Sequence, residues 1–216
     1  MARKTKAEAA LTRHRIVESA RQVFSRAGVT NTSLEQVAKE AGVTRGAVYW
    51  HFRDKADLFR AVRTDTGSLL RLQPTGAGDA LRRLEERLLA AIHRLQREPA
   101  TRQTYEMMLW RCEFVAELAP VRTELMKAGA DFTEEVRALY VQAALEGLTA
   151  PDLDPDLAAL ETFCLYAGMV KLWLADPADG RIRARIEAMI RQHVRGRRRP
   201  GPRLTSAPRP ARKPRS

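Results

Sequence analysis

The sequence predicts an all-α protein of about nine helices. Apolar residues recur every three or four positions through nearly all of the chain, as at Leu81, Leu84, Leu88 and Ile92. No segment alternates apolar and polar residues convincingly, as a half-buried strand would. Ser, Thr or Asp precedes several of the periodic segments and Gly follows others, which is typical of helix caps and helix ends.

The periodic segments form two groups, separated by a Gly- and Pro-containing stretch at 73–78 that predicts a loop. The first group, 9–70, predicts three short helices and a fourth that joins them to the rest of the chain. The second group, 79–195, predicts a larger helical body. Residues 196–216 are rich in Arg and Pro and have little to bury, so they predict a basic disordered tail.

Charge is distributed unevenly along the 216 residues, whose formal net charge is +12. Residues 1–63 hold 13 Lys/Arg against 6 Asp/Glu, residues 195–216 hold 9 Lys/Arg and no acid, and the middle is mildly acidic. This distribution indicates a basic module that faces a polyanion, either nucleic acid or an anionic membrane surface, attached to a neutral or acidic body.

Several classes of protein are disfavoured by what the sequence lacks. There is no run of about 18 uninterrupted apolar residues, and the basic start is not followed by an apolar signal segment. We therefore expect a cytoplasmic protein with no membrane partner. Cys112 and Cys164 each lie in an apolar helical pattern, and we expect both to be buried small hydrophobes in a reducing compartment.

No pattern in the sequence indicates an enzyme or a cofactor. We find no Gly-rich phosphate loop, no metal-ligand spacing and no nucleophile elbow. The four histidines are scattered, and no Cys joins them as a metal ligand. Their positions are His14, His51, His93 and His193.

The joint between the second and third predicted helices has the composition of a helix-turn-helix, over residues 33–52. Ala38 is small enough for close helix approach, Gly42 permits a sharp turn, and Val43 fills the corner. Thr44 is a good N-cap for a third helix of about two turns. At the start of the second helix two capping boxes are possible, Thr32 with Glu35 or Ser33 with Gln36.

The third helix predicts the nucleic-acid contacts. With Ala47, Val48 and Phe52 turned inward, its outer side carries Gly, Tyr and Trp, which do nothing for the stability of a short exposed helix. A helix in the major groove uses such residues for close approach, base reading and phosphate contacts. The predicted DNA-contacting residues are Ser33, Thr44, Arg45, Gly46, Tyr49, Trp50, His51 and Lys55.

Each predicted contact has a physical reason. The Arg45 guanidinium can bond guanine O6 and N7, and the Thr44 methyl can contact a thymine methyl. The side-chain tips of Tyr49, Trp50, His51 and Lys55 can donate to phosphates, as can the free amides of a helix beginning at Ser33. Tyr49 and Trp50 could instead be ordinary core aromatics.

Residues 1–64 resemble the TetR family of repressors, in particular the branch named for the acridine-resistance regulator AcrR, whose members repress multidrug efflux pumps locally. The segments that carry the resemblance are 1–6, 24–25, 28–29, 32–34, 41–47, 49–52, 54–55 and 57–59, with a thinner likeness at 112–114. The resemblance implies a homodimer that binds a palindromic operator and releases it when a small apolar or cationic aromatic inducer binds.

The last two helical patterns, 156–175 and 181–194, are apolar over a wide arc and so predict a dimer interface made as a four-helix bundle. They could instead be buried only against their own body. The candidate interface residues are Leu160, Cys164, Gly168, Leu172, Ile182, Ile186 and Met189.

Between about 79 and 150 the helices are expected to enclose a ligand pocket. Candidate effector-binding residues are adaptable or aromatic, although each could equally be ordinary core. They are Met107, Met108, Trp110, Phe114 and Phe132. We expect the fourth helix, from Asp54 past Val62 towards Leu70, to carry the effect of a ligand to the recognition helix.

A membrane-surface protein or a general nucleic-acid-coating protein would also account for the positive charge. Neither would account for the capped, Gly-containing third helix. Sequence-specific footprinting, compared with salt-sensitive retention on random DNA, separates these functions.

Overall fold

The computed structural model describes residues 6–71 and 78–199, and these residues form helices joined by turns and short loops. Over these ranges there are nine α-helices and one 3-10 helix, with no β-strand beyond one isolated bridge between Thr149 and Arg198. The elements are α1 Lys6–Ala27, α2 Leu34–Glu40, α3 Arg45–His51, α4 Lys55–Thr66, α5 Ala80–Arg97, α6 Pro99–Trp110, η1 Ala116–Leu118, α7 Ala119–Leu145, α8 Pro155–Ala175 and α9 Arg181–Gly196. This agrees with the all-α prediction.

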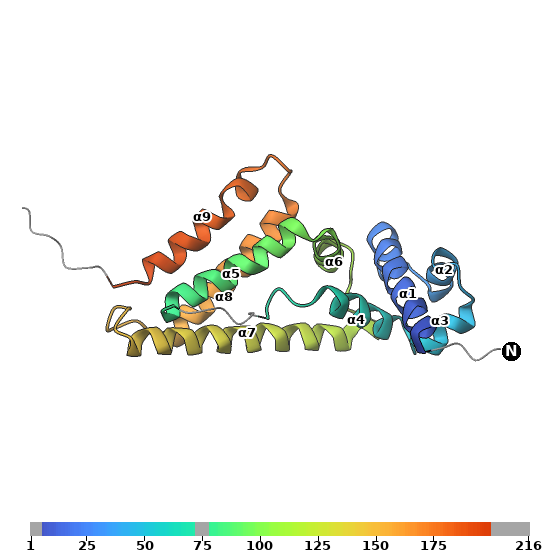
Figure 1. The fold of residues 1–216 in the computed structure, drawn as a ribbon, viewed down its shortest axis with the longest axis horizontal. Helices are drawn as coiled ribbons and strands as arrows, with labels where there is room; N and C mark the ends of the chain where they lie inside the picture. The colour runs from blue at the N-terminus through green and yellow to red at the C-terminus, as the bar shows by residue number, and fades with distance from the viewer. Residues whose placement is uncertain (1–5, 72–77, 200–216) are drawn as a thin grey trace, which may run out of the picture.

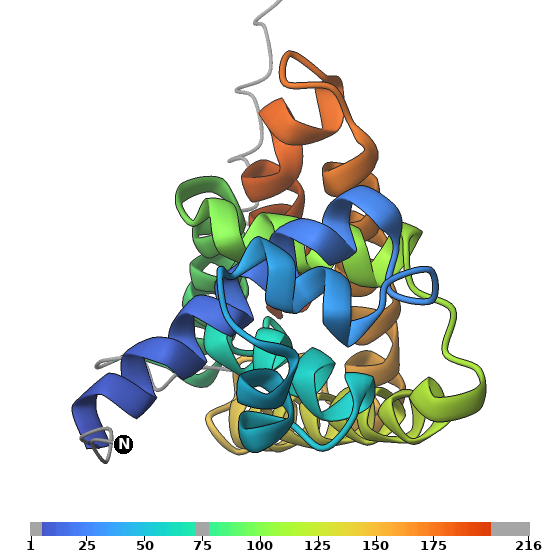
Figure 2. The same cartoon turned by 90° about the vertical axis from the view of Figure 1, so that its right-hand side faces the viewer.

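Helices α1 to α4 form an N-terminal bundle at one end of the molecule, and α5 to α9 form the body (Figures 1 and 2). The predicted caps explain where the bundle's helices begin. Ser33 and Gln36 form the capping box of α2, while Thr44 caps α3 and Asp54 caps α4. Of the two capping boxes open to the sequence, the structure has the one at Ser33.

The turn between α2 and α3 depends on a glycine. Gly42 has φ +62°, in the left-handed region that costs other residues energy. Val43 then follows with its backbone N–H donating to the Ala38 carbonyl oxygen, at 3.0 Å. Buried side chains from α1, α2, α3 and α4 close over this turn as one hydrophobic cluster. The turn thus fixes α3 against the bundle with one side outward.

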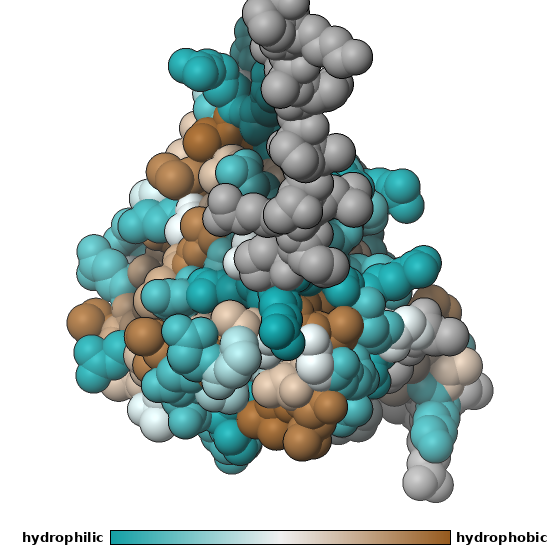
Figure 3. Space-filling model, turned by 90° about the vertical axis from the view of Figure 1, so that its left-hand side faces the viewer, coloured by the Kyte–Doolittle hydropathy of each residue, from teal (hydrophilic) through white to brown (hydrophobic). Residues whose placement is uncertain are grey.

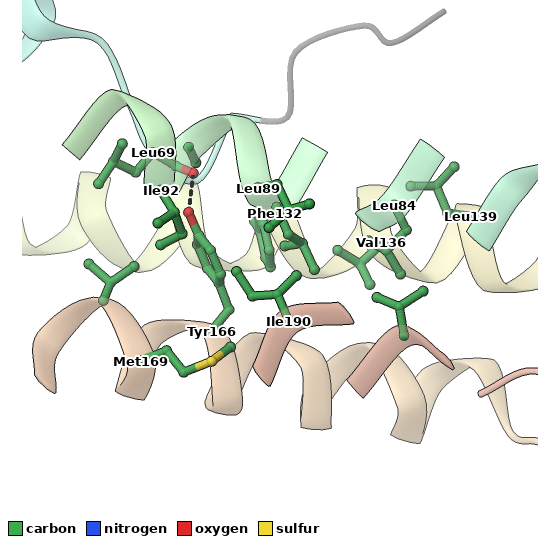
Figure 4. Packing of buried hydrophobic residues seen from close by; sticks show 14 of the residues in the cluster. Leu69, Leu84, Leu89, Ile92, Phe132, Val136, Leu139, Tyr166, Met169 and Ile190 are labelled. Atoms are coloured by element: carbon green, nitrogen blue, oxygen red, sulfur yellow. Dashed lines mark hydrogen bonds between the residues drawn. The ribbon is translucent and has the colours of Figure 1, made fainter. Parts of the chain in front are cut away.

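The body has its own hydrophobic core, and α7 and α8 make its most extensive helix pair. Leucines of α5 meet Val136 and Leu139 of α7, while Tyr166 of α8 and Ile190 of α9 close the other side (Figure 4). Phe132 stacks on Tyr166 with ring centroids 5.5 Å apart and an interplanar angle of 15°. Seen from the end away from the bundle, the surface is mostly hydrophilic with hydrophobic patches between (Figure 3).

Helix α4 is shorter than the sequence predicts. The apolar pattern predicts a helix that runs on towards Leu70, but α4 ends at Thr66, and the next residue, Gly67, has φ +67°. Residues 67–71 are non-helical, so α4 does not continue towards Leu70. Part of the predicted loop at 73–78 lies outside the described residues.

The end of the body also differs from the prediction of a disordered tail from 196. Helix α9 includes Gly196, and the next residues are held by the body. The Arg197 guanidinium pairs with Glu161 at 2.5 Å, and Arg198 pairs with Asp79 at 2.8 Å. The Arg199 N–H also donates to the Leu148 carbonyl at 2.7 Å, and residues 200–216 of the predicted tail lie outside the described residues.

Helix α8 is long and apolar enough to cross a membrane by length and composition, with a mean hydropathy of 1.4 over its most apolar window. Of that window, 44% is buried inside the body, where α8 packs on α7 and α9. Core helices of soluble proteins pass the same test, so this observation alone is weak evidence for a membrane span.

Candidate nucleic-acid interface

Helix α3 turns one side into the bundle and leaves the other open. Val48 and Phe52 are buried, as predicted, and Ala47 is half-buried. Thr44 fixes the start of the helix, because its Oγ1 accepts from the Ala47 backbone N–H at 3.2 Å. Gly46 is exposed, and a Cβ there would meet only the Thr44 hydroxyl oxygen, at 3.9 Å. Because Gly46 has no side chain, another molecule can approach the α3 backbone closely at this position.

The two aromatic residues left open by the sequence lie on the outer side of α3. Trp50 is 73% exposed and Tyr49 is 46% exposed, so they are not core residues of this chain. The Trp50 ring meets the His51 ring edge-on, with centroids 4.5 Å apart. Exposing large aromatic rings to water costs free energy unless a binding partner covers them. The two exposed rings on the outer side of α3 therefore indicate a surface that binds a partner.

Arg45 lies at the first position of α3 with its guanidinium held by two neighbours. It forms an ion pair with Glu35 of α2, and its guanidinium carbon lies 5.3 Å from the centroid of the Tyr49 ring. Contact with the Tyr49 side chain, and next the Glu35 carboxylate, raise the pKa of Arg45 above its ordinary value. Arg45 is therefore a fixed positive charge on the outer face of the recognition helix.

Two other predicted contacts have their polar groups engaged within the protein. The Ser33 backbone N–H donates to the Gln36 side chain at 2.7 Å, and its hydroxyl accepts from the Gln36 N–H. The Lys55 ammonium donates to the Thr30 carbonyl oxygen at 3.0 Å and pairs with Glu117 of η1, also at 3.0 Å. In this structure Lys55 thus links the bundle to the body, and its predicted contact with a phosphate stays a prediction.

A second set of contacts holds the connection that follows α4. The Leu69 N–H donates to the Tyr105 hydroxyl of α6 at 2.6 Å. The Tyr166 hydroxyl of α8 donates to the Leu69 carbonyl at 3.4 Å (Figure 4). Arg94 of α5 donates to the carbonyls of Thr66 and Ser68. We call the three side chains Arg94, Tyr105 and Tyr166 the linker clasp.

Burial raises the pKa of both tyrosines of the linker clasp, so their hydroxyls stay protonated at neutral pH. The protonated hydroxyl is the form that can donate to the Leu69 carbonyl. Three helices of the body, α5, α6 and α8, therefore bind the backbone at the end of α4 and just after it.

A third set of contacts joins the bundle to the body directly. The Val29 N–H donates to the Arg111 carbonyl at 3.0 Å, at the end of α6. Arg60 and Arg63 of α4 both bond to Glu124 of α7, at 2.7 Å and 3.3 Å. Together with the Lys55–Glu117 pair, these bonds hold the bundle on the ends of α6 and α7.

The five predicted effector residues do not lie together. Met107 is 1% exposed and belongs to the core of the N-terminal bundle, which Met108 and Phe114 also contact. Phe132 lies in the body core. Trp110 is half-exposed at the end of α6, with the Lys171 ammonium 5.3 Å from its ring centroid. The structure therefore corrects the prediction of one effector group, because α6 turns one face to the bundle and not to the body.

The predicted dimer residues also divide into two groups. Leu160 and Leu172 are 52% and 55% exposed, Cys164 is exposed rather than buried as predicted, and a Cβ on Gly168 would meet nothing within 4 Å. Leu157 and Leu165 are also exposed on α8. Ile186 of α9 is 1% exposed inside its own body, and Ile182 and Met189 are half-buried against the same core. Ile186 is thus a core residue of the protomer, a correction to the prediction.

Sequence reasoning missed Glu35 and the linker clasp. The sequence indicates Glu35 as a capping partner of Thr32, but its place ten positions before Arg45, across the predicted turn, also suits an ion pair. The clasp had no such signal, because Tyr105 and Tyr166 bond to a backbone that any sequence would supply.

Comparison with known families matches both parts of the chain. Residues 16–62 match the family described as bacterial regulatory proteins, tetR family. Residues 79–195 match the C-terminal region of MAATS-type transcriptional repressors. The first match covers most of the N-terminal bundle, and the second covers nearly the whole body.

Individual proteins are similar over most of the chain. The transcriptional regulator AcrR of Shigella flexneri is 36% identical over 182 residues, which are 82% of this chain and 85% of that protein. The regulator TtgR of Pseudomonas putida is 32% identical over 182 residues, 82% of this chain and 87% of TtgR. The crystal structure of NalD, the secondary repressor of the MexAB-OprM multidrug efflux pump in Pseudomonas aeruginosa, has a TM-score of 0.76 and 33% identity. That likeness covers 90% of this chain and 99% of NalD.

Proposed function

This chain belongs to the TetR family of bacterial transcriptional regulators, and we propose that it represses a multidrug efflux operon and releases the operator when a drug-like compound binds. As a member of this family it is a DNA-binding regulator and not an enzyme. The efflux target is supported by the relatives, because NalD is described as repressor of a multidrug efflux pump. We place its action in the cytoplasm, where the operator is.

The single observation that carries the proposal is the outer face of α3. In our proposal α3 lies in the major groove, where Arg45 bonds a guanine edge and Thr44 meets a thymine methyl. Gly46 allows the backbone to approach the bases. The side chains of Tyr49, Trp50 and His51 contact phosphates beside the groove and fix the register of the helix.

In our proposal the protein binds a palindromic operator as a homodimer, and the exposed side of α8 forms the dimer interface. One short helix reads few base pairs, and a dimer places two such helices about 34 Å apart, one turn of DNA. The exposed apolar stripe on α8 supplies a surface to bury. Gly168, with open space around it, allows a second helix to come close.

The inducer binds in the body, in our proposal, against the aromatic group that adjoins the linker clasp. Phe132 packs on both Phe163 and Tyr166, and Tyr166 is the residue that bonds to Leu69. An apolar or cationic aromatic compound that separates these rings displaces the Tyr166 hydroxyl from the Leu69 carbonyl. The end of α4 is then released, and the spacing of the two recognition helices changes.

The required coupling is modest. A preference of about 1–3 kcal/mol weakens operator binding by about 5–150-fold, and operator must then weaken inducer binding by the same factor. Tetraphenylphosphonium is a suitable first probe because it is an aromatic cation too bulky to stack between base pairs. Triphenylphosphine oxide is its neutral counterpart and tests whether the charge matters.

The test begins with DNA footprinting on the region upstream of the protein's own gene and of any adjacent efflux operon. We expect protection of a palindrome, and Arg45→Ala should weaken binding to it by about 1–3 kcal/mol. Equal binding to the palindrome and to random DNA would instead identify a general nucleic-acid-coating protein. If Arg45→Ala and the unmodified protein bind the operator equally well, the proposal that α3 lies in the major groove is wrong.

A further inference from the structure

The pair between Glu35 and Arg45 lies beside the outer face of α3, the proposed DNA-reading surface. A carboxylate beside the groove repels phosphate, so an acidic residue there weakens binding unless it does something else. Glu35 lies on α2 and Arg45 on α3, and the pair therefore bridges the two helices of the helix-turn-helix across its turn. Both side chains are largely exposed, at 61% and 62%.

The pair is not explained by stability. Exposed ion pairs contribute about 0–1 kcal/mol, and salt screens them further. The capping box at Ser33 already anchors the start of α2, and the buried cluster holds α2 against α3. The pair does restrict the conformational freedom of the Arg45 side chain, because its guanidinium is held between the Glu35 carboxylate and the Tyr49 ring.

A held guanidinium reads DNA differently from a free one. Bonding to guanine O6 and N7 takes two of the five N–H donors of arginine, so another edge stays available for a carboxylate. A side chain already fixed in position loses less rotamer entropy when it binds. At a guanine, Arg45 can thus keep Glu35 and gain two bonds. Other bases do not offer the guanidinium two adjacent acceptors in the major groove. At those bases Arg45 stays paired with Glu35 and does not pair with a phosphate.

We propose that Glu35 is a specificity-determining residue, which positions Arg45 for guanine and withholds its charge from non-cognate DNA. This inference rests on the proposed placement of α3 in the major groove. Glu35 does not itself need to touch a base. Its effect is to raise the ratio of operator affinity to random-DNA affinity, at some cost to the affinity for DNA in general.

The experiment measures affinity for two duplexes, one enriched by the unmodified protein from a random-sequence pool and one of unselected random sequence. Glu35→Gln keeps the size of the side chain and removes its charge. We expect Glu35→Gln to bind random DNA more tightly, with a salt slope steeper by about 0.9, because Arg45 is released to a phosphate. Preference for guanine at the step read by Arg45 should fall by about fivefold or more.

Glu40→Gln is the matched control. It removes the same charge from the same helix, but Glu40 pairs with Arg26 of α1 at 2.8 Å and not with α3. We expect this control to raise affinity for both duplexes by similar, smaller factors and to leave guanine preference unchanged. An equal change in guanine preference in the two variants would overturn the proposal, because net charge would then account for the effect.

A double-mutant comparison separates the inference from the function beneath it. In an Arg45→Ala background, Glu35→Gln should no longer alter the preference at that base step. If Arg45→Ala leaves operator affinity unchanged, the proposed placement of α3 fails. If Arg45→Ala weakens binding but Glu35→Gln leaves guanine preference intact, only the role of Glu35 fails. Melting temperatures should be similar throughout, since the pair is exposed.

Discussion

The hydroxyl of Tyr166 in the centre of α8 donates to the backbone carbonyl of Leu69, three residues beyond the end of α4. The Leu69 N–H donates to the hydroxyl of Tyr105, so a buried tyrosine and a half-buried one bond to both backbone polar groups of Leu69. Leu69 thereby connects the ring that stacks on Phe132 to the helix that supports the DNA-reading surface. A hydrogen bond of the body core therefore reaches the chain three residues after α4.

Tyr166→Phe tests this path. Removing the hydroxyl leaves the ring in place and should cost about 0.5–1.5 kcal/mol of stability, because one hydrogen bond is lost. We expect operator binding to persist while the coupling between inducer and operator falls. The measurement is tetraphenylphosphonium affinity with and without operator, determined by calorimetry for Tyr166→Phe and for the unmodified protein.

Tyr140→Phe is the control for this prediction. Tyr140 is also a buried tyrosine of the body, but its hydroxyl bonds to Thr162, 2.8 Å away, and not to the connection after α4. We expect this variant to lose similar stability and to keep the coupling. A coupling that is unchanged in Tyr166→Phe, or reduced equally in both variants, would mean that the linker clasp carries no signal.

Lys55→Ala distinguishes a structural lysine from a phosphate contact. If Lys55 held a phosphate, the variant would bind DNA with a salt slope lower by about one. Since its ammonium pairs with Glu117 and bonds to the Thr30 carbonyl, we expect an unchanged slope and a weaker joint between bundle and body. Glu117→Gln should reproduce the effect, because it removes the same ion pair from the other side. A lower slope in Lys55→Ala alone would restore the phosphate role.

The sequence was informative wherever structure is decided locally. Thr44 and Asp54 begin helices because a short polar side chain can accept from the first free amides. Gly42 marks a turn because only glycine takes its φ at little cost. The unusual outer face of α3 could likewise be read from residues within one helix, whereas the sequence left open whether Trp50 is exposed or a core aromatic.

The sequence was uninformative wherever a partner is distant. Periodicity shows that Met107 lies on the apolar side of a helix, but not that this side faces the bundle instead of the body. The bonds of Leu69 reach residues 36 and 97 positions away. The same limit explains why Ile186 was assigned to the dimer interface. Both a protomer core and a dimer interface require an apolar residue at that spacing.

His193 predicts how stability depends on pH. Burial, and next the Arg197 guanidinium, lower the pKa of His193 below its ordinary value, while the Glu161 carboxylate acts in the opposite sense. Its Nε2 lies 2.8 Å from the Thr162 hydroxyl, which also bonds to Tyr140. The unfolded chain therefore takes up a proton at a higher pH than the folded chain does. Stability conferred by neutral His193 is present above pH of about 6.5 and is lost as the pH falls below it.

The measurement is urea unfolding between about pH 5 and pH 8 for the unmodified protein and for His193→Gln. We expect the variant to be less stable near neutrality and to lose less stability towards acid. His14→Gln, which changes an exposed histidine of α1, serves as the control and should keep the full dependence. If His193→Gln and the unmodified protein show parallel curves, His193 does not titrate in this way.

The dimer prediction uses two substitutions that the structure places in opposite environments. A side chain added at Gly168 meets nothing in its own protomer, so Gly168→Leu should leave the fold intact while it blocks a second helix from approaching α8. Ile186 lies in the core of the body, so Ile186→Asp buries a charge and should destabilise the protomer itself by several kcal/mol. Sedimentation reports the assembly and circular dichroism the fold. We expect Gly168→Leu to give folded monomers that no longer protect the palindrome, and Ile186→Asp to lose helix content.

Because Cys164 is exposed on the same face of α8, alkylation of its thiol adds a second readout of the dimer interface. Its thiol should react slowly in the unmodified dimer and quickly in Leu172→Asp, which leaves the cysteine in place and opens the interface. A dimer that persists in both Gly168→Leu and Leu172→Asp, with Cys164 equally reactive throughout, would place the interface on another surface of the body.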